Sequence, residues 1–181
     1  MQVQTTIHSI TDMKPGDHTC CIYDTDKEYR NIVTPFLRKG LEQNGKVCYI
    51  VDNRDPKTII NYLKNDGVDV EHYQKNGQFS ILSSTDTYLK GGVFDPDGMM
   101  SILSSETQKA LDEGYTALRG TGEMSWALRG LSGSERLIEY VDNLCTRSPL
   151  SGTASIITFT MFRQKSVRKK TCREKNEFLD H

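Results

Sequence analysis

Apolar residues along the chain follow two alternating patterns, which are short unbroken runs and longer stretches with helical spacing. Each run predicts a strand, because about four to eight consecutive apolar residues between turn signals are typical of a strand covered on both faces. The runs lie at 18–23, 46–51, 79–82, 115–118 (continuing toward 126) and 154–162. The helical stretches lie between them, at 25–44, after Asp55, after Asp95 and after Ser132.

Start signals support these helices. Thr25 and Glu28 have the spacing of a capping box, in which each side chain accepts a hydrogen bond from a free backbone N–H. Asp55-Pro56 and Asp95-Pro96 each combine an N-cap acid with a proline at the first helical position. Pro35 lies inside the first stretch and predicts either a kink near residue 31 or a late regular start.

Strands that alternate with helices predict βαβ units, and these place parallel strands in one sheet with helices on both faces. We therefore expect one α/β domain over residues 1–162, with three αβα layers and a mainly parallel central sheet. Ligands of such sheets bind beyond the carboxyl ends of the strands. This rule nominates the segments 23–24, 52–53, 83–84, 120–126 and 161–163.

Charge divides the chain unequally, although the net charge of its 181 residues is only −1. Residues 163–175 contain seven Lys or Arg residues and one Glu, and the rest of the chain is acidic. We expect a basic C-terminal tail over 163–181 that contacts an acidic signalling partner, and no direct binding of nucleic acid by the body.

The expected compartment follows from the segments that the sequence lacks and from its cysteines. No apolar run approaches the roughly 18–20 residues of a membrane helix, and the first residues lack a signal-peptide core. The odd number of cysteines, five, favours reduced thiols. We expect a cytoplasmic protein with no membrane partner, and the sequence leaves a homo-oligomer open.

A phosphate-binding loop is missing between the first strand and its helix. The segment YDTDKEYRN has no glycine to wrap a phosphate and no Gly-Lys-Ser/Thr ending. Asp24 and Asp26 would also repel a triphosphate. We expect no ATP hydrolysis and no cofactor.

The first strand concentrates side chains that can carry chemistry. His18 and Cys20 share one face of it, and Cys21 and Tyr23 share the other. Imidazole and thiolate at this spacing can bind one soft ion such as zinc, with Cys48 as a third ligand. The alternative is that the cysteines are small buried apolar residues.

The segment GTGEMSW at 120–126 is the second concentration. Glu123 would lie at the carboxyl end of the fourth strand, where a carboxylate can act as a base or bind a ligand. It can equally form an ion pair, for instance with Arg119 or Arg129. Trp126 is either a ligand platform or a core residue.

These segments together resemble a known family. GDHTCCIYDTDKEY, FLRKGLEQNGKVCYIVDNRDP and RGTGEMSW are similar to the MEDS domain, the methanogen/methylotroph DcmR sensory domain, over residues 14–160. Residues 36–83 are more distantly similar to the KaiC-like branch of the RecA superfamily. The resemblance implies a RecA/KaiC-like fold without a Walker A loop, which agrees with the missing glycines.

The family resemblance implies a non-catalytic sensory domain for small hydrocarbon derivatives, such as methylated or halogenated one-carbon compounds. It assigns ligand binding to His18, Cys20, Tyr23, Glu123 and Trp126 and assigns no catalytic residue. His18 and Tyr23 are about 16 Å apart on an extended strand. We therefore expect His18 to act with Cys20, and Tyr23 to act with Glu123 at the mouth of a pocket.

Two alternatives stay open. One is a degenerate KaiC-like nucleotide-dependent enzyme, and the other is a thiol- or metal-dependent sensor that uses His18 and Cys20. The resemblance also implies an output module, and none fits in this sequence. Output through protein–protein contacts of the tail is the simplest hypothesis.

Overall fold

The computed structural model describes residues 10–146, 154–161 and 170–171. The strands are β1 (His18–Tyr23), β2 (Lys46–Val51), β3 (Phe79–Ser83), β4 (Leu118–Glu123), β5 (Ala154–Met161) and β6 (Lys170–Thr171). The α-helices are α1 (Asp26–Glu42), α2 (Pro56–Asn65), α3 (Val70–Lys75), α4 (Pro96–Asp112) and α5 (Leu137–Thr146). Short 3-10 helices are η1 (Ile10–Asp12), η2 (Ser125–Arg129) and η3 (Ser134–Arg136).

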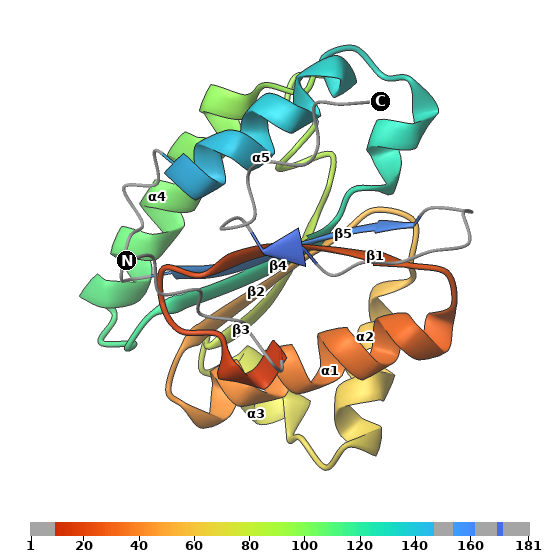
Figure 1. Ribbon diagram of the computed structural model, residues 1–181. Helices are drawn as coiled ribbons and strands as arrows, with labels where there is room; N and C mark the ends of the chain where they lie inside the picture. Colours follow the sequence, from red (N-terminus) through yellow and green to blue (C-terminus); the bar gives the residue numbers. More distant parts are fainter. Residues whose placement is uncertain (1–9, 147–153, 162–169, 172–181) are drawn as a thin grey trace, which may run out of the picture.

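One six-stranded sheet organises these elements, in the order β3-β2-β4-β5-β1-β6. The first five strands of that order are parallel, and β6 pairs antiparallel with β1. In Figure 1, α1, α2 and α3 lie on one face of the sheet, and α4 and α5 lie on the other. The predicted three-layer αβα fold with a mainly parallel sheet is confirmed.

The helix starts follow the predicted capping chemistry. Thr25 and Glu28 form a complete capping box at α1. Asp55 caps α2 and Asp95 caps α4, each followed by proline in the first turn. The late start predicted from Pro35 is wrong, because α1 begins at Asp26 and includes Pro35. The buried face of α1 offsets the cost of an internal proline, about 3 kcal/mol, through contacts of Val33, Thr34, Phe36, Leu37 and Leu41.

One α-helix and one strand were not predicted from the sequence. α3 is only six residues long, and Asp69 caps its first turn. β6 lies within the segment predicted as a basic tail, and it pairs Lys170 with Cys20 and Thr171 with Thr19. Both are too short to show a hydrophobic period, so the sequence pattern could not reveal them.

The sheet separates two hydrophobic cores. Beside α1–α3, the core is built around Tyr29, Phe36 and Tyr49; beside α4–α5, it is built around Phe94, Trp126 and Tyr140. All six residues of β2 are buried, as expected for a strand covered on both faces. Among the helices of the described residues, none is both long and apolar enough to cross a membrane.

Candidate functional site

Glu123 lies at the carboxyl end of β4 with its carboxylate almost fully enclosed. Its Oε2 accepts hydrogen bonds from the backbone N–H groups of residues 52, 53 and 54, at 3.0, 2.9 and 3.3 Å. Its Oε1 accepts a 2.7 Å bond from the Tyr49 hydroxyl and lies 3.4 Å from Arg54 Nε. The side chain is only 4% exposed. These contacts fix the loop after β2 and leave little access for a substrate.

Arg54 joins Glu123 to Tyr23. Its Nη2 donates a 3.3 Å hydrogen bond to the Tyr23 hydroxyl and a 2.9 Å bond to Asp26. Its guanidinium also lies 4.0 Å from the centre of the Tyr29 ring. The Tyr29 hydroxyl is hydrogen-bonded to Tyr49. Burial raises the pKa of Tyr23, against the opposing effect of Arg54, so its hydroxyl stays protonated at neutral pH.

Asp52 ties together the loops that follow β2, β3 and β4. It accepts hydrogen bonds from the hydroxyls of Ser84 at 2.6 Å and Ser125 at 2.5 Å. Arg129 binds both of its oxygens, at 2.8 and 2.9 Å. Burial raises the pKa of this carboxyl group, but the bonds from Arg129, Ser125 and Ser84 outweigh it and lower the pKa. We call Tyr49, Asp52, Arg54, Glu123 and Arg129 the carboxyl-edge network.

Arg54 is therefore the ion-pair partner of Glu123, and the predicted partners Arg119 and Arg129 are wrong. Arg129 instead binds Asp52. Arg119 packs over the Phe36 ring, 4.8 Å from its centre, and donates to the backbone oxygens of Met13 and Phe36. The sequence could not reveal which arginine pairs with Glu123. It places Glu123 at the end of a strand, but it does not show which arginine of another segment reaches that end.

The start of α1, where a P-loop protein binds phosphate, is also occupied by the chain itself. The Glu28 carboxylate accepts the backbone N–H groups of Asp24 and Thr25, at 2.9 and 3.3 Å. The Thr25 hydroxyl accepts the N–H of Glu28. Three N–H donors of the kind that binds phosphate at a helix start thus already have carboxylate or hydroxyl partners.

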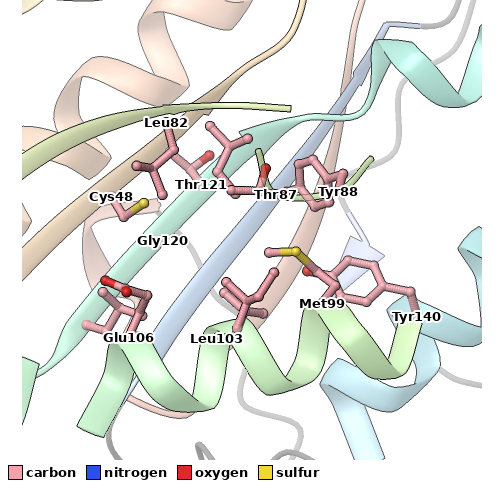
Figure 2. A pocket seen from close by; sticks show the side chains of 13 residues that line it. Cys48, Leu82, Thr87, Tyr88, Met99, Leu103, Glu106, Gly120, Thr121 and Tyr140 are labelled. Carbon is pink, nitrogen blue, oxygen red and sulfur yellow. The ribbon is translucent and has the colours of Figure 1, made fainter. Parts of the chain in front are cut away.

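An apolar pocket opens on the opposite face of the sheet, beneath α4 (Figure 2). Strands, α4, α5 and the turns after β3 line this pocket. Its lining residues are Cys48, Ile50, Leu82, Thr87, Tyr88, Met99, Ile102, Leu103, Glu106, Leu118, Gly120, Thr121 and Tyr140. Its volume is about 20 Å³, enough for a water molecule or a group of similar size such as a methyl. We call this cavity the α4 pocket.

The two ends of the α4 pocket differ in chemistry. In Figure 2, Cys48 and Glu106 lie at one end, and Tyr88 and Tyr140 lie at the other. Burial raises the pKa of Cys48 to about 11, so its thiol is protonated and a poor nucleophile at neutral pH. At the other end, the Tyr140 hydroxyl is buried and has no hydrogen-bond partner in the described part of the chain.

Trp126 supports the tyrosine end of the α4 pocket without lining it. It is fully buried, with ring centres 4.5 Å from Phe94 and 5.6 Å from Tyr88. Tyr140 packs edge-on against Phe94 at 5.6 Å. Trp126 directly follows Ser125, which binds Asp52, so the aromatic wall and the carboxyl-edge network share the η2 segment.

His18 and Cys20 lie away from both places. They occupy the face of β1 opposite Cys21 and Tyr23, which belong to the α1–α3 core. His18 is 8% exposed, its Nε2 has no hydrogen-bond partner within the described residues, and burial lowers its pKa. β5 and β4 separate β1 from β2, and Cys48 is in register with His18, which places these two residues about 14 Å apart, with Cys20 farther still. In the part of the chain that the structure describes, no three His, Cys, Asp or Glu side chains gather as metal ligands do.

The five residues expected to bind ligand are thus distributed over three places. Arg54 joins Tyr23 to Glu123, Trp126 supports the α4 pocket, and His18 lies with Cys20 on β1. The pocket-lining residues Tyr88, Met99 and Tyr140 were missed by the sequence reasoning. The only signal at Met99 and Tyr140 was the apolar periodicity of helices, which also describes ordinary core residues, and Tyr88 lies in the turns after β3, where no periodic pattern marks it.

Comparison with known proteins identifies the family and the fold. The sequence model of a family described as MEDS, the MEthanogen/methylotroph, DcmR Sensory domain, matches residues 17–152. Among solved structures, a KaiC-like protein from the hyperthermophilic archaeon Pyrococcus horikoshii is similar, with a TM-score of 0.54 and 17% identity over 87% of this chain and 77% of that chain. This confirms the predicted RecA/KaiC-like fold. No curated protein matches the sequence.

Proposed function

The chain belongs to the MEDS family of sensory domains, and we propose that it is a non-catalytic sensor that binds a small hydrocarbon derivative in the α4 pocket. The observation that carries this proposal is the pocket itself, a small, mainly apolar cavity with a buried hydroxyl at one end. A methylated or halogenated one-carbon compound matches the apolar lining but is larger than the single methyl that the cavity holds as it stands, so the lining would move on binding.

The state of Glu123 supports a sensor over an enzyme. A general base needs access to the proton that it removes. The Glu123 carboxylate is instead bound by Tyr49 and three backbone N–H groups. The capped N–H groups at the start of α1 likewise disfavour the nucleotide-dependent alternative.

A route from the pocket to the surface supports signalling. Tyr88 lines the pocket and packs against Trp126, and the adjoining Ser125 binds Asp52. Arg129 binds the same carboxylate, and its side chain is 41% exposed. A ligand that shifts Tyr88 would therefore change the position of η2. A protein partner that contacts this edge, or the basic residues 163–175, would respond to that change.

Thermal unfolding with a panel of small compounds tests the proposal. Methanol, methylamine and dichloromethane are added to the wild-type chain below the concentrations that denature proteins. A ligand at 100 times its Kd stabilises by about 2.7 kcal/mol, which corresponds to a rise in Tm of roughly 5–10 °C for a domain of this size. At least one compound is expected to raise Tm in a saturable way.

Two isoleucines provide the matched controls. Ile102 lines the α4 pocket and Ile60 lies on α2 beside the other core; both are half-buried. Ile102→Trp should abolish the ligand-dependent rise in Tm, and Ile60→Trp should retain it. A rise that survives Ile102→Trp would place the ligand elsewhere, and ATP turnover lost in Glu123→Gln would favour the enzyme.

A further inference from the structure

We infer that Tyr140 selects the ligand, and that the α4 pocket takes a small uncharged molecule with a hydrogen-bond acceptor directed at the Tyr140 hydroxyl. This inference rests on the proposed function and specifies its ligand class. In Figure 2 the Tyr140 ring extends from α5 toward the pocket, beside Met99 and Leu103 of α4.

The Tyr140 hydroxyl is a donor that finds no full acceptor among the residues that the structure describes. The residue is 0% exposed, and its oxygen makes no hydrogen bond. The Tyr88 hydroxyl lies beside it and lowers its pKa as a hydrogen-bonding neighbour would, although the distance and angle between the two groups fall outside those of a full hydrogen bond. Burial raises the pKa of Tyr140, so the proton stays on the oxygen. Buried polar groups without a partner are rare because they are costly.

The remaining lining restricts the charge of the ligand. Glu106 is the one charged side chain among the described lining residues, and it lies at the end away from Tyr140. An anion would be repelled by it, and a cation placed beside Tyr140 would lose its hydration among Met99 and Leu103 without gaining a counter-ion. A neutral molecule with one acceptor and a small apolar body satisfies the hydroxyl and fills the apolar space.

Methionine methyl groups provide a direct measurement. Met99 lines the pocket, whereas Met13 is buried in the core on the other face of the sheet. The full chain, labelled at its methionine methyls, is titrated by NMR with methanol, which has an acceptor, and with ethane, which is similar in size and has none. Both probes are expected to shift Met99 in a saturable way and to leave Met13 unchanged.

Tyr140→Phe then isolates the hydroxyl. We expect the Kd for methanol to rise roughly tenfold, as for the loss of one hydrogen bond, and the Kd for ethane to stay within about twofold of its wild-type value. Because the Kd of each probe for the variant is compared with its Kd for the wild type, the difference in hydration between methanol and ethane cancels. Tyr62→Phe, at a half-buried tyrosine of α2 outside the pocket, should change neither Kd.

A second measurement on the wild type covers the case in which Tyr140→Phe does not fold. The hydroxyl proton of Tyr140 should move downfield with methanol and not with ethane. Equal methanol affinity in wild type and Tyr140→Phe, or an unmoved hydroxyl proton, overturns the role of Tyr140 but leaves the sensor intact if the thermal panel gives a hit. The absence of a saturable Met99 shift with either probe also overturns the inference, and the thermal panel then decides the proposed function separately.

Discussion

Individual buried polar residues in this domain fall into two classes. Asp52 and Glu123 each accept several hydrogen bonds from serines, tyrosine, arginine or backbone N–H groups. Such bonds to a charged group are worth about 1.5–3 kcal/mol each, so these carboxylates hold the fold together. Other buried groups have no such partner within the described residues, among them His18 Nε2, Trp126 Nε1 and the hydroxyls of Thr121 and Tyr140, and a ligand or a proton that supplied a partner would change their free energy.

His18 predicts a pH dependence of stability. Burial lowers its pKa from the ordinary 6.5, with Asp17 opposing. The unfolded chain therefore takes up the proton first as the pH falls. The contribution of His18 to the free energy of unfolding should be complete above about pH 6.5 and be lost as the pH drops below it. Urea unfolding at pH 7.5, 6.5 and 5.5 measures this.

The two matched variants are His18→Gln and, at an exposed histidine of α3, His72→Gln. His18→Gln should flatten the dependence over this range, and His72→Gln should leave it as in the wild type. If the free energy of unfolding changed equally with pH in the wild type and in His18→Gln, the folded protein would bind a proton at His18 as readily as the unfolded chain does.

At the scale of elements, β4 brings the sheet and the pocket wall into close contact. A Cβ on Gly122 would lie 2.4 Å from the Tyr88 hydroxyl and 3.1 Å from the Ile50 Cβ. Glycine at this position thus permits Tyr88 to lie against the sheet at the inner end of the pocket. Packing at this point of β4 therefore requires a residue without a side chain.

Gly122→Ala should destabilise the domain by about 1–3 kcal/mol, as overpacking does. Tyr88→Phe in the same chain should recover part of that loss, because it removes the atom that clashes. Gly40→Ala provides the contrast, since its Cβ would meet Arg119 Cδ at 2.7 Å and Tyr88→Phe cannot relieve it. Denaturant unfolding of the double-mutant cycle measures the coupling, and strictly additive losses would contradict this account.

Elements with local start signals were predictable, and those formed by tertiary contacts were not. Thr25, Asp55 and Asp95 mark helix starts by chemistry that acts within one turn, and the structure places each cap as predicted. β6 exists through its pairing with β1, which no local pattern encodes. The grouping of the candidate site residues could not be predicted for the same reason. The spacing of His18, Cys20 and Tyr23 shows which face of β1 each occupies, but it does not show what packs against those faces.

On the scale of the whole molecule, the boundary between domain and tail can be tested. Sequence analysis places the domain at 1–162 and a basic tail at 163–181, yet Lys170 and Thr171 pair with β1. A chain that ends at residue 162 leaves this edge of β1 without β6, and an open edge promotes pairing between chains. We expect the shortened chain to self-associate more than the full chain in light scattering after size-exclusion chromatography.

Thr171→Pro is the matched variant, because it removes a backbone donor of β6 and keeps the basic charge of the tail. It should self-associate in the same direction as the shortened chain, although less strongly. If both variants match the full chain in oligomeric state and Tm, the tail is a solvated extension of the domain, as the sequence analysis predicts.

The enclosure of Glu123 has a consequence for the empty receptor. A sensor of a scarce molecule is ligand-free most of the time. Local unfolding of the ligand-free state could then produce a signal when no ligand is bound. Here the backbone N–H groups of residues 52–54, a cradle of the kind that binds external anions in other proteins, already hold a carboxylate of the same chain. The fold therefore supplies its own counter-charge to these N–H groups, and a sensor built on it would need no bound anion to keep this loop in place.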